Sequence, residues 1–243
     1  MAPRFDIAKQ VDLLGADSLL PPSKYVASGA GAILCDPPWQ FSTWSPKGRD
    51  RCPDAPMTRN ESRRNNPERH YKTMTLDSVK ALRVGDIAAK DCLLFLWATD
   101  PMIPQAIAVG QGWGFTFKTV GFYWIKTRRE TSTRGAPKDY PMGTGYWTRA
   151  NPEQCLLFSR GHPKRLSASV RKLIVSPRRD HSQKPDEIYG LIEQLVSGPY
   201  VELFARQRWP GWHAWGDQVD KFSVTYPRPG AAEREKGDLF SVL

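Results

Sequence analysis

Residues that bind structural metals or form disulfide frameworks are scarce in this sequence. Its 243 residues include only four cysteines and four histidines. The cysteines (Cys35, Cys52, Cys92 and Cys155) form no Cys-x-x-Cys pair, and the histidines are dispersed. Because zinc sites and disulfide scaffolds need clustered ligands or a regular cysteine framework, we expect neither of them, and no metal at the functional site.

Long apolar runs are absent as well. No stretch of about 18 apolar residues occurs, and the first residues lack the basic-then-apolar pattern of a signal peptide. We therefore expect a soluble, cytoplasmic protein that does not enter the membrane. With 40% hydrophobic residues the chain can form one core. We predict a single domain over residues 1–220 and a loosely attached extension over residues 221–243.

Acidic residues are outnumbered by basic ones. Thirty-five lysines and arginines against 25 aspartates and glutamates give a net charge of +10. The excess is local, because residues 160–184 contain eight basic residues and one acidic residue, and residues 47–72 contain eight and four. Such patches are typical of surfaces that bind phosphate backbones; the alternative is a solvated face that only keeps the protein soluble.

Apolar runs alternate with segments of helical pattern, which is typical of an α/β fold with a mainly parallel sheet. The predicted strands are residues 32–35, 92–98, 119–125, 154–159, 171–176 and 200–205. The predicted helices are residues 75–84, 101–113 and 184–198. Two long segments, residues 40–72 and 126–150, fit neither period and follow predicted strands. Since ligands in open α/β sheets bind outside the carboxyl ends of the strands, both segments should border one site.

The first predicted strand ends in the sequence Asp36-Pro37-Pro38-Trp39. Each proline fixes its own φ and favours an extended conformation in the residue before it, and neither proline has an N–H. The segment therefore offers a carboxylate and carbonyl groups to an amine, beside an indole ring on which a planar base can stack. This combination favours an exocyclic amine on a heteroaromatic base; the alternative is a plain turn after a strand.

Six further blocks follow in order, and with the DPPW block they resemble the MT-A70 family of adenine N6-methyltransferases over about residues 17–220. The blocks are RHYKTM (69–74), LFLWATD (94–100), GFYWIKT (121–127), GTGYWTRANPEQCLLFSRG (143–161), HSQKPDEIYGLIE (181–193) and VELFAR (201–206) with GWHAWGDQVD (211–220). The likeness is to bacterial and phage DNA adenine methyltransferases in particular. It implies a Rossmann-like α/β fold, a mainly parallel sheet with helices on both faces, S-adenosylmethionine as cofactor, and a place at the nucleoid of a bacterial host.

The resemblance also implies roles for individual residues. Asp36 and the carbonyl of Pro37 would hold the target amine in a catalytic segment that continues through Pro38 and Trp39, with the ring of Trp39 on the adenine. The residues expected to contact substrate are Tyr71, Lys126, Trp147 and Lys184. The residues expected to bind the cofactor are Asp17, Ser18, Leu19, Asp36, Glu202, Phe204, Arg206, Asp217 and Gln218.

The predicted reaction is methyl transfer to the 6-amino nitrogen of adenine in DNA, with residues 160–184 following the phosphates. Adenine in RNA, the 4-amino group of cytosine, and a catalytically inactive nucleic-acid-binding subunit are the alternatives. The segment Asp238-Leu239-Phe240 resembles peptides that dock on bacterial sliding clamps, although the glutamine usually found ahead of it is missing. A homo-oligomer is not excluded.

Overall fold

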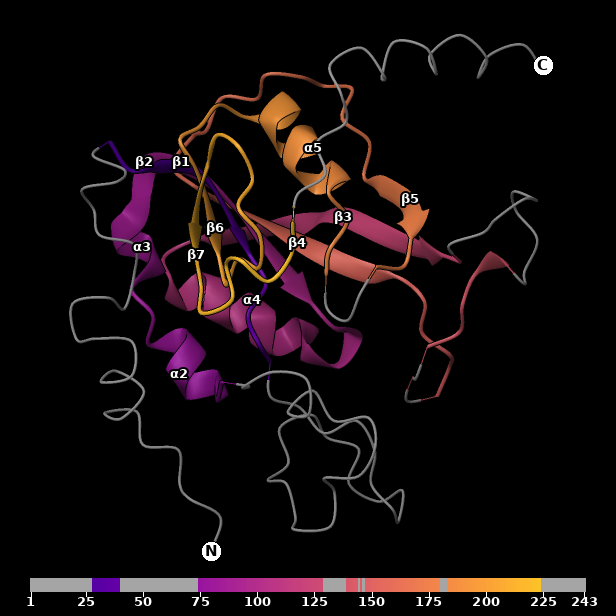
Figure 1. The fold of residues 1–243 in the computed structure, drawn as a ribbon. Helices are drawn as coiled ribbons and strands as arrows, with labels where there is room; N and C mark the ends of the chain where they lie inside the picture. Colours follow the sequence, from indigo (N-terminus) through magenta and orange to yellow (C-terminus); the bar gives the residue numbers. More distant parts are fainter. Residues whose placement is uncertain are drawn as a thin grey trace, which may run out of the picture.

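The computed structural model describes residues 28–39, 74–128, 139–143, 145, 147–179 and 183–223 (Figure 1). Strands of these residues form one sheet in the order β5-β3-β4-β2-β1-β6-β7. The strands are β1 (Ala30–Cys35), β2 (Ala88–Ala98), β3 (Thr116–Thr127), β4 (Glu153–Arg160), β5 (Leu173–Pro177), β6 (Tyr200–Leu203) and β7 (Trp212–Trp215). Strand β4 is antiparallel to β2 and β3, and the other pairs are parallel. The predicted α/β fold with a mainly parallel sheet is confirmed.

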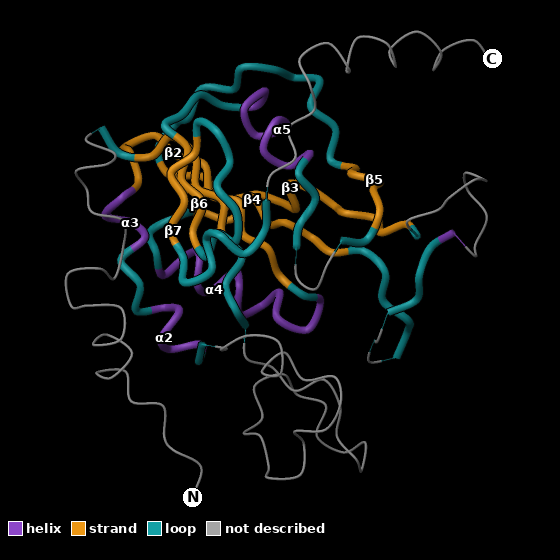
Figure 2. Tube along the Cα trace, viewed as in Figure 1, coloured by secondary structure: helices purple, strands orange, loops and turns teal. Residues whose placement is uncertain are grey.

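Helices cover both faces of this sheet. They are α2 (Leu76–Lys80), α3 (Val84–Ile87), the 3-10 turn η3 (Asp100–Met102), α4 (Ile103–Gly112) and α5 (Glu187–Leu195). Apolar residues of α2, α3 and α4 pack with Ile33, Leu94 and Leu96 in one core. Apolar residues of α5 pack with Leu34 and Phe95 in the other. Figures 1 and 2 accordingly show α5 on one side of the sheet and α2 and α4 on the opposite side.

The predicted elements are present with two differences. All six predicted strands occur within a few residues of their expected positions, but β7 was not predicted because its four residues are flanked by glycines and polar residues. The helix predicted over residues 75–84 ends at Lys80, and α3 follows as a separate turn. Thr75 is the N-cap of α2, since its Oγ1 accepts a 3.1 Å hydrogen bond from the amide of Ser78.

Strand β1 lies at the point where the direction of chain travel across the sheet reverses. The chain passes from β1 to β2 on one side, and after β5 and α5 it returns to β6 on the other side of β1. Ligands of open α/β sheets bind outside the carboxyl ends of the strands at such a switch point. The segment that follows β1 here is Asp36–Trp39, so topology alone directs attention to it.

The basic run at residues 160–184 is divided between opposite edges of the sheet. Because β4 is antiparallel, it ends at the edge where β2 begins: Arg160 donates to the carbonyl of Gly85, and the amide of His162 donates to Asp91. Arg178 and Lys184, by contrast, come after the carboxyl end of β5. A strand of eight residues spans roughly 25 Å. The two ends of this run therefore lie far apart, and its contact with phosphates stays a prediction.

Three of the cysteines can be placed. Cys35, Cys92 and Cys155 are buried free thiols, and Cys52 lies outside the described residues. In the part of the chain that the structure describes, no three histidine, cysteine or acidic side chains gather as a metal site would require. No helix within those same residues is long and apolar enough to cross a membrane.

Two glycines of α4 give a matched test of the packing between this helix and the sheet. A Cβ on Gly110 would lie 2.5 Å from the ring of Phe158, whereas a Cβ on Gly112 would meet nothing within 4 Å. We expect Gly110→Ala to lower the free energy of unfolding by about 1–3 kcal/mol through overpacking. Gly112→Ala should leave it unchanged or raise it by up to about 1 kcal/mol. Urea denaturation measures both, and equal effects would contradict the packing described.

Candidate active site

A hollow opens at the carboxyl edge of the sheet, where β1, β2 and β6 end. It has a volume of about 350 Å³, part of which is open to solvent. The residues that line it are Asp36, Trp97, Gln183, Lys184, Tyr189, Glu202, Phe204, Arg206, Gln207 and Phe222. The hollow therefore lies where the strand order predicts a ligand site.

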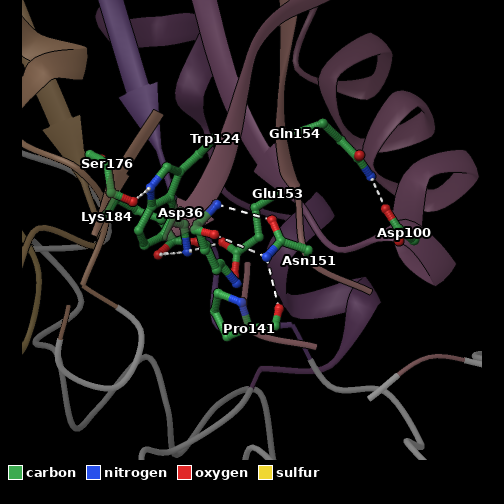
Figure 3. A network of polar contacts seen from close by, with 10 residues as sticks. Asp36, Asp100, Trp124, Pro141, Asn151, Glu153, Gln154, Ser176 and Lys184 are labelled. Atoms are coloured by element: carbon green, nitrogen blue, oxygen red, sulfur yellow. Dashed lines mark hydrogen bonds and ion pairs between the residues drawn. The ribbon is translucent and has the colours of Figure 1, made fainter. Parts of the chain in front are cut away.

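One lysine joins two carboxylates at this hollow. Nζ of Lys184 lies 2.9 Å from Oδ2 of Asp36 and 3.2 Å from Oε2 of Glu153. Glu153 also pairs with Lys126, whose Nζ lies 2.5 Å from Oε1. These side chains are only 18–24% exposed. Because the two acids alternate with the two cations, their charges balance, which half-buried ionised groups require (Figure 3).

Glu153 is the centre of this ion-pair chain, and the antiparallel strand β4 places it there. It is the first residue of β4 and lies opposite Trp124 of β3, two residues before Lys126. Burial by itself raises the pKa of the Glu153 carboxyl, but the ammonium groups of Lys184 and Lys126 outweigh burial and lower the pKa to about 2. Glu153 is thus held as a carboxylate between two strands and the segment before α5.

Asn151 fixes the base of the segment that connects β3 to β4. Its amide nitrogen donates to the carbonyls of Lys126 (3.0 Å) and Pro141 (2.8 Å), and its amide oxygen accepts from the backbone N–H of Lys126 (3.1 Å). Figure 3 shows Asn151 and Pro141 beside Glu153. The described part of the 126–150 segment therefore borders the site, as predicted, while residues 129–138 and 40–73 lie outside the described residues.

A second polar network occupies the opposite wall of the hollow. The hydroxyl of Tyr189 donates to Oε2 of Glu202 (2.9 Å) and accepts from Nε2 of Gln207 (3.1 Å), which also donates to Asp186 (2.8 Å). Trp209 stacks on Tyr189 with ring centroids 4.5 Å apart. Burial raises the pKa of Glu202 to about 8; the Tyr189 hydrogen bond opposes this rise, and the charge of Asp36 adds to it. Glu202 is therefore mostly a neutral acid near pH 7.

The segment after β6 is turned sharply at Phe204, which has a φ of +60°. This left-handed conformation costs a side-chain-bearing residue on the order of 1–3 kcal/mol and is found mainly at functional sites. The turn is completed by Gly216, where a Cβ would lie 2.7 Å from the carbonyl oxygen of Ala205. The amide of Phe222 then donates to the carbonyl of Arg206 (2.9 Å), which brings the Phe222 ring to the hollow.

Asp217 and Gln218 lie in the turn between β7 and Phe222, adjacent to the hollow in sequence but not among its lining residues. Oε1 of Gln218 accepts from Nζ of Lys221 (3.1 Å). The extension expected from residue 221 onward thus begins with residues that contact the domain, and residues 224–243 lie outside the described part.

Residues of the DPPW block form hydrogen bonds with other groups of the protein. The carbonyl of Pro37 accepts from the amide of Trp39 (2.8 Å), which leaves one lone pair for a ligand, and the carbonyl of Pro38 accepts from Met74 (2.9 Å). The ring of Trp39 is 4% exposed, and its Nε1 donates to the carbonyl of Trp97 (2.9 Å). In this arrangement Trp39 has no open face, so stacking on a base stays a prediction that requires the ring to be uncovered.

The remaining predicted residues fall into two groups. Trp147 is 91% exposed and does not line the hollow, whereas Lys126 belongs to the ion-pair chain through Glu153. The others lie outside the described residues: Asp17, Ser18, Leu19, Tyr71, Asp238, Leu239 and Phe240.

Sequence reasoning missed several residues of the site. They are Glu153, Gln183, Tyr189, Gln207 and Phe222. Glu153 and Tyr189 do lie within blocks that resemble the family, but a glutamate at a strand start and an aromatic on a helix give no signal of their own. Trp97 is buried at 2% exposure, and its ring lies 5.5 Å from Nζ of Lys184.

The ion-pair chain predicts an acid-dependent stability. The folded-state pKa of Glu153 is about 2 against an ordinary value of 4.5. A lowered pKa stabilises the folded state above pH 4.5, and this stabilisation, about 3 kcal/mol, is lost as the pH falls to 2. We expect Glu153→Gln to remove most of this stabilisation at pH 7. The free energy of unfolding of the variant should then change little between pH 4.5 and pH 2. Urea denaturation across this range measures it.

The exposed pair Arg83–Asp86 provides the matched control, since both side chains are more than half exposed. Asp86→Asn should lower the free energy of unfolding by less than about 1 kcal/mol. If Glu153→Gln and Asp86→Asn lowered the free energy of unfolding at pH 7 by the same amount, the ion-pair chain would not hold the site together.

For Glu202 we predict that the stability of the folded state depends on pH in the opposite direction. Its pKa is raised from 4.5 to about 8 in the folded state. A raised pKa means that stability present below pH 4.5 is lost as the pH rises to 8. Glu202→Gln should therefore gain stability over the wild-type chain between pH 5 and pH 8.5 by urea denaturation. Parallel profiles for the two proteins would show that Glu202 is ionised throughout.

Comparison with known proteins agrees with this site. The sequence model of the MT-A70 family matches residues 31–218. The type II methyltransferase M.MunI of Mycoplasma sp is 31% identical over 169 residues, 68% of this chain and 67% of that protein.

Eukaryotic relatives are matched over a smaller share of their length. The N(6)-adenosine-methyltransferase MT-A70-like protein of Drosophila melanogaster is 29% identical over 80% of this chain and 28% of its own. The N(6)-adenosine-methyltransferase catalytic subunit METTL3 of Homo sapiens is 27% identical over 80% and 29%. This chain therefore spans less than a third of the length of these two relatives. Since the family match covers most of the chain and confirms the resemblance, the chain belongs to the MT-A70 family of S-adenosylmethionine-dependent N6-adenine methyltransferases.

Proposed function

We propose that this chain transfers the methyl group of S-adenosylmethionine to the 6-amino nitrogen of adenine in DNA. The observation that supports this most is the Asp36–Lys184 pair at the carboxyl end of β1, on the wall of a hollow that also contains Glu202, Phe204 and Arg206. A carboxylate held by an ammonium group beside such a hollow is suited to orient an amine against a bound cofactor.

The residues of the hollow fit the chemical groups of the cofactor. Lys184 and Arg206 supply positive charge for a carboxylate, and Glu202 supplies an acid that can ionise beside a cationic group. Phe204 and Phe222 supply flat apolar surface. Asp217 and Gln218, in the adjoining turn, are the proposed partners of the ribose hydroxyls, and Asp17, Ser18 and Leu19 those of the cofactor's adenine.

In this proposal the residues of the protein promote the reaction by holding the target amine in the orientation that methyl transfer requires. Bound S-adenosylmethionine supplies an electrophilic methyl group. Asp36 and the free lone pair of the Pro37 carbonyl accept the two amine hydrogens of adenine, which draws the nitrogen lone pair out of conjugation and toward the methyl group. Transfer of the methyl group would release one amine proton, which the Asp36 carboxylate would accept. Lys126, Tyr71 and Trp147 are proposed to contact the substrate directly, and Lys184 to act on it by holding Asp36.

The choice of DNA rests on the likeness to bacterial and phage members. The Mycoplasma relative has a similar extent to this chain, whereas the named adenosine methyltransferases are matched over less than a third of their length. A base inside a duplex is out of reach of such a site, so the enzyme must flip the adenine or act on single strands. Adenine in RNA is the second candidate, which the relatives named N(6)-adenosine-methyltransferases favour.

Labelled cofactor tests the proposal with single- and double-stranded DNA and with single-stranded and structured RNA. We expect label in DNA, recovered as N6-methyladenine after digestion and mass spectrometry. Asp36→Ala should lower turnover by about 100-fold or more, because it removes the acceptor of the amine hydrogen.

Asp77→Asn, which alters an exposed acid of α2, is the matched control and should retain full turnover. Label in RNA alone would refute DNA as substrate. Cofactor binding without label on any polymer would indicate an inactive subunit, and full activity of Asp36→Ala would refute the assignment of the site.

A further inference from the structure

One part of the sheet is left uncovered on the side of α4. Tyr123 and Ile125 of β3 lie in register with Leu173 and Val175 of β5, and paired residues of parallel strands point to the same face. We call these four residues the open face. Tyr123 is 39% exposed, Leu173 is 58% exposed and Val175 is 53% exposed, while Ile125 is half-buried. Strand β5 is at the edge of the sheet (Figure 1), so these four apolar or aromatic side chains form a surface there.

The alternate residues of the same strands show that this exposure is confined to one face. Phe122, Trp124 and Ile174 point the other way and are buried in the core beneath α5. On the α4 side, Phe117 and Val120 pack against the core of that helix, so α4 covers the first half of β3 only. The open face begins where this cover ends, so three exposed side chains and one half-buried one lie together outside the core.

The strands that form the open face have charge of one sign. Residues 118–128 and 171–179 contain seven basic residues and no acidic residue. Lys126 and Arg179 pair with Glu153 and Asp186. The other five are exposed: Lys118, Arg128, Arg171, Lys172 and Arg178. An apolar surface with a cationic border fits a ligand that has both planar apolar groups and negative charge.

We propose that the open face binds a single-stranded stretch of nucleic acid next to the target base. This inference rests on the proposed function. A base would stack on Tyr123, the aliphatic side chains of Ile125, Leu173 and Val175 would contact sugars and neighbouring bases, and the five cations would contact phosphates. Lys126 follows Ile125 directly but points to the opposite face, where it lies over the ring of Trp124 and pairs with Glu153, so the bound strand would pass around the carboxyl end of β3 to reach the site.

The charge also argues against a second copy of this chain as the occupant. Two-fold pairing through the open face would bring two sets of the same five cations together without an acid on either strand segment. Like charges placed opposite each other at an interface cost affinity, whereas a polyanion gains affinity from every cation.

The test measures affinity for a fluorescent single-stranded oligonucleotide by anisotropy, using the full chain. Tyr123→Ala should weaken binding roughly tenfold, since stacking on one aromatic ring contributes about that much. Tyr123→Phe keeps the ring and should bind as the wild-type chain does. Leu173→Ala should weaken binding, whereas Leu166→Ala, an exposed leucine of similar accessibility outside the open face, is the matched control and should not.

The outcomes separate this inference from the function on which it rests. If the wild-type chain methylates adenine but Tyr123→Ala binds the oligonucleotide with unchanged affinity, the open face is not the binding surface and only this inference fails. If the wild-type chain is a dimer that Tyr123→Ala dissociates, with oligonucleotide affinity unchanged, a second copy is the occupant and the inference is overturned. If the wild-type chain labels no polymer, the proposed function fails first.

Discussion

The ammonium group of Lys184, shared between Asp36 and Glu153, is the interaction on which the arrangement of the site depends. It joins three segments that are far apart in the sequence: the end of β1, the start of β4 and the approach to α5. Carboxylates that are only 18–24% exposed are costly without a cation, and a cation at this depth is costly without carboxylates. Each group therefore makes the placement of the others possible. Lys126 completes the balance at the outer end of the chain.

The two walls of the hollow differ in charge state, and this difference suits the proposed reaction. On the Asp36 side, two cations keep Glu153 ionised, with a pKa of about 2. On the other side, burial keeps Glu202 largely protonated, with a pKa of about 8, and it accepts a hydrogen bond from Tyr189. Acids whose environments separate their pKa values commonly have different roles in one site. In the proposed reaction Asp36 would orient the amine, whereas Glu202 would ionise in response to the cationic cofactor.

Among the described residues, every strand except β7 and the place of Asp36 after the first strand could be predicted from the sequence, because these depend on local patterns. Buried parallel strands are short apolar runs, and Asp36 follows the first of them in a segment stiffened by two prolines. The direction of β4, by contrast, depends on tertiary pairing, which apolar periodicity does not contain. That direction places Glu153 opposite Trp124 and carries Arg160 to the far edge of the sheet. The missed glutamate and the divided basic run therefore have the same physical cause.

The central claim is that Lys184 acts by holding Asp36, and a double-mutant cycle on the single-turnover rate of methyl transfer tests it most directly. The four proteins are the wild-type chain, Asp36→Ala, Lys184→Gln and the double variant, each with saturating cofactor. The account predicts that the double variant is no slower than Asp36→Ala alone, because Lys184 has nothing left to position. A rate for the double variant equal to the product of the two single losses would contradict it and would assign Lys184 a role independent of Asp36.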